Sequence, residues 1–79
     1  MNAVGARTLQ AIAAERRRQD KKWGEQNHDR FKWLSILGEE VGEANRAALE
    51  EHSDEYREEL VQVAAVCVAA IESYYRGNW

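Results

Sequence analysis

Hydrophobic residues along this chain recur at intervals of three and four residues, and no segment alternates as a strand would. This pattern predicts an all-α fold made of one domain over residues 1–79. The expected helices cover about residues 6–21, 30–50 and 54–76. In the first of them, one stripe of the helix surface holds Leu9, Ile12, Ala13 and Arg16.

The helix ends are marked by capping residues and glycines. Gly24 follows the first helix, and Gly77 is a plausible stop for the third. We expect Asp29 or Asn27 to cap the second helix, and Ser53 or Asp54 to cap the third.

The link "EHSD" between the second and third helices is short, which predicts an antiparallel helical hairpin with the first helix added to it. The third helix is apolar almost all round, and a lone hairpin cannot cover both of its sides. We therefore expect an oligomeric helix bundle, either a homodimer or a dimer of dimers. Gly38 and Gly42 lie opposite Glu40 and would allow another helix to approach closely.

A glutamate occupies the middle of the apolar arc on each helix of this hairpin. At a helical advance of about 100° per residue, Glu40 lies within about 80° of six apolar or small residues. These are Trp33, Ile36, Leu37, Ala44, Ala47 and Ala48. Glu59 is likewise central to the arc of Val63, Val66 and Ala70. Glu43 and Gln62, each three residues further on, are offset by about 60° toward the same side of the hairpin.

A buried carboxylate needs a paired cation or a metal. One interpretation is that Glu40 and Glu59 form ion pairs with arginines such as Arg16 or Arg46, in a plain helical hairpin. The other is that Glu40, Glu43, Glu59 and Gln62 converge on a cation. We favour the metal site, because each of the paired helices carries such a glutamate with a second oxygen donor three residues further on. Oxygen ligands favour Mg²⁺, with Mn²⁺ as a substitute, and such sites are usually completed by substrate phosphates.

Composition narrows the classes of partner. The net charge is −3, so a general nucleic-acid-binding surface is not expected, although "RRRQDKK" is locally basic. The longest apolar run, around Cys67, is too short to cross a bilayer, and no signal peptide is visible. A single cysteine suits a reducing compartment, so we expect a soluble cytoplasmic protein that does not bind membranes.

The acidic pattern resembles a known family. Glu39-Glu40-Val41-Gly42-Glu43, followed after a gap by Glu59-Leu60-Val61-Gln62, is similar to the motif of the MazG-like all-α nucleoside triphosphate pyrophosphohydrolases. The segment "ERRRQDKKWGEQNH" also resembles a compact branch of that superfamily found in phages and mobile elements. Together these stretches cover about residues 15–72.

The resemblance implies a house-cleaning type of hydrolase that cleaves a ribo- or deoxyribonucleoside triphosphate between its α and β phosphates. The products would be the monophosphate and pyrophosphate, with Mg²⁺ as cofactor. It also implies that Glu40, Glu43 and Glu59 are metal ligands and catalytic residues, and that the bundle is assembled from two or more chains.

Gln62 departs from that motif, which has aspartate at this position. An amide oxygen can ligate a metal but brings no negative charge. Three alternatives are open. We hypothesise that the site works with three carboxylates. Otherwise Glu55 or Glu58 supplies the missing carboxylate, or the activity is weak.

The connection before the second helix is where we expect the substrate to bind. Trp23 would stack on a base, and Lys22 would meet a phosphate. Hydrogen bonds to base or sugar would come from Gln26, Asn27 and His28, and Trp33 would wall the pocket. Structural alternatives are a core plug for Trp23, a cap or surface position for His28, and core packing for Trp33.

Two hypotheses about the function remain. The first is the Mg²⁺-dependent nucleotide pyrophosphohydrolase. The alternative is a non-enzymatic helical protein on the same scaffold, which binds a partner or a nucleotide and has a weakened metal site at Gln62.

Overall fold

The computed structural model describes residues 1–79 as three α-helices, with no strand. They are α1 (Ala3–Trp23), α2 (Arg30–Leu49) and α3 (Ser53–Tyr75). The all-α fold is confirmed, and the helix boundaries differ from expectation mainly at α1. That helix begins earlier because the Asn2 side chain caps it, accepting a hydrogen bond of 2.7 Å from the Gly5 N–H.

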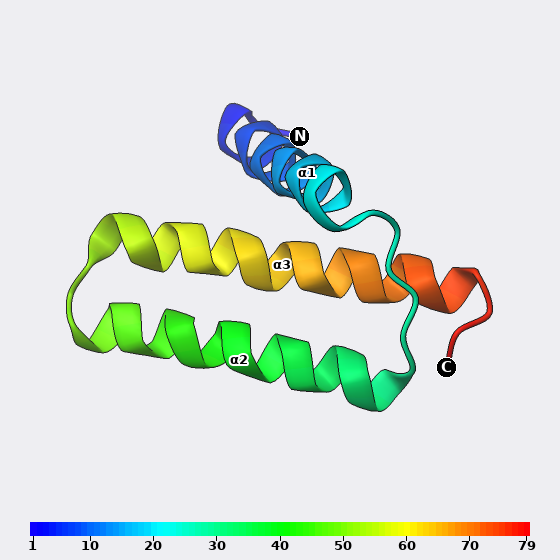
Figure 1. The fold of residues 1–79 in the computed structure, drawn as a ribbon. Coiled ribbons are helices and arrows are strands. Elements are labelled where there is room, and N and C mark those ends of the chain that lie inside the picture. Colours follow the sequence, from blue (N-terminus) through cyan, green and yellow to red (C-terminus); the bar gives the residue numbers. More distant parts are fainter.

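α2 and α3 form the expected antiparallel hairpin, and the two helices lie side by side along their length (Figure 1). Toward the end of the hairpin away from its turn, the two helices share a small core cluster of Trp33, Val66 and Ala69, against which Ile36, Leu37 and Ala70 pack. Only 7 of 79 residues are buried, which is a thin core for a chain of this length.

The caps of the hairpin helices are partly as expected. Asp29 caps α2 by accepting a 3.0 Å hydrogen bond from the Lys32 N–H. The expectation for α3 was wrong, because α3 already includes Ser53 and its N-cap residue is His52, which makes no side-chain cap bond. Asp54 lies within the first turn instead, where its negative charge favours the helix N-terminus.

α1 packs against α3 and not against α2, and it runs obliquely to the hairpin (Figure 1). None of its residues is fully buried. Its best-defined anchor is Arg16, which pairs with Glu72 of α3 at 2.8 Å and with Asp20 of its own helix at 3.0 Å.

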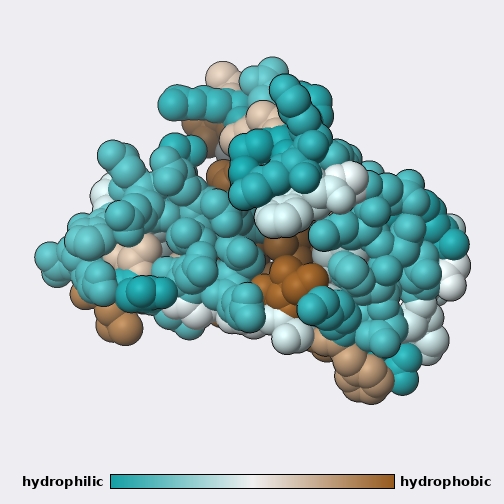
Figure 2. All heavy atoms as spheres, viewed as in Figure 1, coloured by the Kyte–Doolittle hydropathy of each residue, from teal (hydrophilic) through white to brown (hydrophobic).

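The surface seen in Figure 2 is mostly hydrophilic, with hydrophobic residues showing in a hollow between α1 and the hairpin. Other large apolar side chains stay open to solvent, among them Leu34, Ile71 and Tyr74. No helix combines the length and the apolar character that a membrane crossing requires. Gly38 and Gly42 face open space, and no other helix approaches them within the chain.

Candidate metal centre

Three glutamates meet between the hairpin helices. Glu40 and Glu43 come from the middle of α2, and Glu59 comes from the second turn of α3. One carboxylate oxygen from each lies within 4.8 Å of the other two. The antiparallel register of the short turn brings Glu59 opposite Glu40 and Glu43.

The glutamates at the centre of this cluster are not neutralised by arginine. Glu40 Oε2 and Glu59 Oε2 are buried and have no hydrogen-bond partner. Arg16 is engaged with Glu72 and Asp20, and the Arg46 guanidinium forms no ion pair. The interpretation of Glu40 and Glu59 as ion-paired to arginine is therefore wrong.

The proximity of these carboxylates changes their proton affinity. Burial, with the neighbouring charge of Glu43, raises the pKa of Glu40 above its ordinary value. Burial, followed by the close approach and charge of Glu43 and Glu40, raises the pKa of Glu59 to about 7. Clustered carboxylates with raised pKa values and orphaned oxygens are an arrangement that a bound cation relieves.

The donor set suits a hard divalent cation. All three groups offer carboxylate oxygen, with no imidazole or thiolate among them. Mg²⁺ and Mn²⁺ prefer such ligands, and the two orphaned oxygens provide unused electron pairs. The residues present therefore fit the expected ion.

Gln62 lies one turn after Glu59 on α3 and faces α1. It lines a cavity of about 370 Å³ between α1 and α3 together with Glu15 and Arg18. Of the proposed substitutes for its missing charge, Glu58 lines this same cavity, whereas Glu55 hydrogen-bonds His52 near the helical turn.

Glu15 is an acidic residue near the cluster that the sequence did not single out. Its charge is a further cause of the raised Glu40 pKa, and its side chain is only 13% exposed. Arg18 binds both Glu15 oxygens, at 2.9 and 2.6 Å, and these hydrogen bonds lower the pKa of Glu15. The only signal for it in the sequence is its place one turn after Ile12 on the stripe that faces α3.

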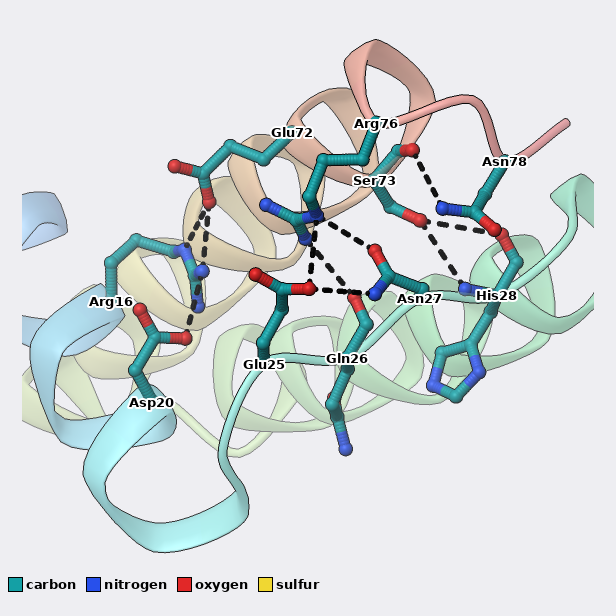
Figure 3. Close-up of polar contacts among 10 residues, drawn as sticks. All are labelled: Arg16, Asp20, Glu25, Gln26, Asn27, His28, Glu72, Ser73, Arg76 and Asn78. Carbon is teal, nitrogen blue, oxygen red and sulfur yellow. Dashed lines mark hydrogen bonds and ion pairs between the residues drawn. The ribbon is translucent and has the colours of Figure 1, made fainter.

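Three of the residues expected to bind substrate lie in the α1–α2 connection and are bonded to the end of α3 (Figure 3); they are Gln26, Asn27 and His28. Arg76 donates to the Asn27 side chain at 2.7 Å and to the Gln26 carbonyl at 3.3 Å. The buried Ser73 hydroxyl accepts from the His28 N–H at 3.2 Å and lies 3.4 Å from the His28 carbonyl oxygen. We name Gln26, Asn27, His28, Ser73 and Arg76 the clasp.

The clasp does not adjoin the carboxylates within one chain. Ser73 lies fourteen residues after Glu59 on one continuous helix, which corresponds to about 21 Å along its axis. A substrate role for Gln26, Asn27 and His28 stays a prediction, and their observed bonds are structural.

The remaining substrate candidates fall into two groups. Trp23 is 61% exposed, so its interpretation as a core plug is wrong, and the Lys22 ammonium lies 4.8 Å from its ring centroid. Trp33 is buried in the core and touches the His28 ring edge-on, so it packs as the structural alternative expected.

The chain matches no protein-family model, and no curated protein or solved structure matches it significantly.

Proposed function

We propose that this chain is a Mg²⁺-dependent nucleoside triphosphate pyrophosphohydrolase. The observation that supports it most is the cluster of Glu40, Glu43 and Glu59, in which two buried carboxylate oxygens have neither a cationic nor a hydrogen-bonding partner. The likeness of the acidic pattern to the MazG-like motif supplies the reaction and the substrate class.

In the proposed reaction, water attacks the α-phosphorus and the bond from that phosphorus to the bridging oxygen of the β-phosphate breaks. Pyrophosphate leaves with the electron pair of that bond, and the water loses a proton as the monophosphate forms. Mg²⁺ bound at the cluster would neutralise phosphate charge and favour ionisation of the attacking water.

The side chains have separate tasks in this scheme. Glu40 and Glu59 would hold the cation from the two facing helices, and Glu43 would complete the set from the exposed edge. One of these carboxylates also orients the attacking water and accepts its proton. Mn²⁺ would serve in place of Mg²⁺ because it accepts the same ligands.

Product analysis tests the proposal. The purified protein is incubated with a panel of ribo- and deoxyribonucleoside triphosphates and Mg²⁺ or Mn²⁺, beside Glu40→Gln and a matched control, Glu51→Gln. Glu51 is exposed at the α2–α3 turn and is not part of the cluster, and its change removes the same charge. We expect monophosphate and pyrophosphate from wild type and the control, and none from Glu40→Gln.

The same experiment separates the alternative function. A folded wild-type protein that turns over no triphosphate would favour a non-enzymatic role in binding a partner or a nucleotide. Gln62 and the exposed apolar side chains are the features that would support that role.

We further propose that two or more copies assemble through the exposed apolar face of the hairpin. This face holds a cavity of about 400 Å³, lined mainly by Leu34, Ile71, Tyr74 and Trp79. Apolar patches of this kind mark interaction sites, and a second copy would supply the core that one chain lacks.

A further inference from the structure

A second cavity opens from the carboxylate cluster toward the α2–α3 turn. It has a volume of about 400 Å³ and is lined by Glu43 and Glu59 of the cluster, together with Arg46, Ala47, Glu50, His52 and Glu55. Ala47 is the only apolar residue in this lining, and it contains no Phe, Tyr or Trp. Because six of its seven residues are charged or titratable, the cavity suits a charged group better than a nucleobase.

Arg46 is the one arginine in this lining, and its guanidinium is free. Glu43 precedes it by three residues and Glu50 follows it by four, spacings at which helical side chains commonly pair. Neither glutamate forms an ion pair or a hydrogen bond with it. The other titratable base, His52, already contacts Glu55 at 3.2 Å.

Arginines elsewhere are engaged differently. Arg16, Arg18 and Arg76 each bind a carboxylate or an amide of their own chain. Arg30 stacks on Phe31 and Trp79. Among the arginines, Arg46 alone combines a place beside the candidate metal ligands with an unused set of guanidinium donors.

We propose that Arg46 binds the β and γ phosphates of the substrate, which become the departing pyrophosphate. The triphosphate then lies with its phosphate end toward the α2–α3 turn and its nucleoside toward the opposite side of the cluster. This inference rests on the proposed function. A guanidinium matches phosphate oxygens with two parallel hydrogen bonds, which an ammonium cannot reproduce.

The charge of the cavity sets a condition on this binding. Four carboxylates line it, so a free polyphosphate is repelled until a divalent cation neutralises the cluster. Pyrophosphate is therefore expected to bind only when Mg²⁺ is present, and Arg46 then supplies donors that the metal does not. The metal alone needs no contact from Arg46.

Calorimetric titration tests these statements on the whole chain. Mg²⁺ is titrated alone, and inorganic pyrophosphate is then titrated in excess Mg²⁺. The proteins are wild type, Arg46→Ala, Arg46→Lys and the control Arg17→Ala, whose arginine is exposed on α1 and unpaired. Arg46 is also exposed, so its replacement leaves the fold intact.

We expect Arg46→Ala to bind Mg²⁺ no more weakly than wild type and to bind pyrophosphate about 10- to 100-fold more weakly. Arg46→Lys should recover part of this loss, and Arg17→Ala should bind as wild type. In turnover, Arg46→Ala should raise KM for the triphosphate and weaken inhibition by added pyrophosphate.

Two results would overturn the inference, and they are distinguishable. If wild type binds Mg²⁺ and hydrolyses triphosphate while Arg46→Ala binds pyrophosphate as tightly as Arg17→Ala, the role of Arg46 is wrong and the proposed function stands. If wild type binds neither Mg²⁺ nor pyrophosphate and hydrolyses nothing, the proposed function fails and the role of Arg46 fails with it.

Discussion

Glu59 is the residue whose ionisation is most altered by the fold, because burial and the neighbouring Glu43 and Glu40 raise its pKa from 4.5 to about 7. A folded-state pKa above the unfolded value means that the folded protein binds the proton more tightly. The resulting stabilisation is complete below about pH 4.5 and is lost as the pH rises through about 7.

Glu59→Gln should therefore change the pH dependence of the metal-free protein. The variant carries no charge at this position, so it avoids the repulsion that wild type gains on ionisation. With a chelator present, we expect its melting temperature to exceed that of wild type by more at pH 8 than at pH 5. An equal difference at the two pH values would contradict the raised pKa of Glu59.

Gln62→Asp tests whether Gln62 is a metal ligand. If Gln62 is a ligand as predicted, an aspartate there adds a fourth carboxylate one turn after Glu59, so we expect tighter Mg²⁺ binding in calorimetric titration without loss of folding. Gln10→Asp on the exposed surface of α1 makes the same chemical change and serves as control. If both variants bind Mg²⁺ as wild type does, Gln62 lies outside the metal shell.

The positions of some site residues could be predicted from the sequence, and those of others could not. Helical geometry alone placed Glu40, Glu43 and Glu59 on facing surfaces, because their positions depend only on the period of each helix and the short turn. Glu15 depends on how α1 docks, and the free state of Arg46 depends on its side-chain conformation. Neither is determined by a spacing in the sequence.

The clasp holds the α1–α2 connection against the end of α3. Ser73→Ala removes the hydroxyl that bonds the His28 backbone and leaves a part-buried N–H without its partner. We expect a loss of about 1–3 kcal/mol in the free energy of unfolding, measured by urea denaturation. Ser35→Ala, on the exposed surface of α2, should change it by less than about 0.5 kcal/mol. Equal small effects would show that the clasp does not stabilise the fold.

The hydrophobic stripe of α1 predicts the helix but not how the helix packs on α3. The spacing of Leu9, Ile12, Ala13 and Arg16 predicts a helix, and the helix is present. Of that stripe Ile12 and Arg16 are half-buried, whereas Leu9 stays 53% exposed and Ala13 is open to solvent. A helix with no fully buried residue is positioned by polar contacts such as Arg16 with Glu72, which periodicity does not reveal.

For the whole molecule, the exposed apolar face of the hairpin predicts self-association. Leu34, Ile71 and Tyr74 are each more than half exposed, and burying them against a second copy is favourable. We expect a dimer or a larger species by light scattering. Ile71→Glu places a charge in this face and should shift the mass to the monomer, whereas Glu51→Gln at the turn should not. A monomeric wild-type protein would contradict the assembly.

The antiparallel hairpin could be predicted because a link as short as "EHSD" places the next helix antiparallel to the one before it. The separation of the clasp from the cluster could not, since the path of the α1–α2 connection is set by Ser73 and Arg76 at the distant end of α3. The assembly of copies stays a prediction of the exposed apolar residues.

Binding of a divalent cation by Glu40, Glu43 and Glu59 underlies the proposed function, and the melting temperature with and without Mg²⁺ or Mn²⁺ tests it. A ligand that binds only the folded protein stabilises it, by about 2.7 kcal/mol at a hundred times its Kd. We expect a clear rise for wild type and for Glu51→Gln, whose glutamate lies outside the cluster, and none for Glu40→Gln. A wild-type melting temperature unchanged by either ion would show that the cluster is not a metal site.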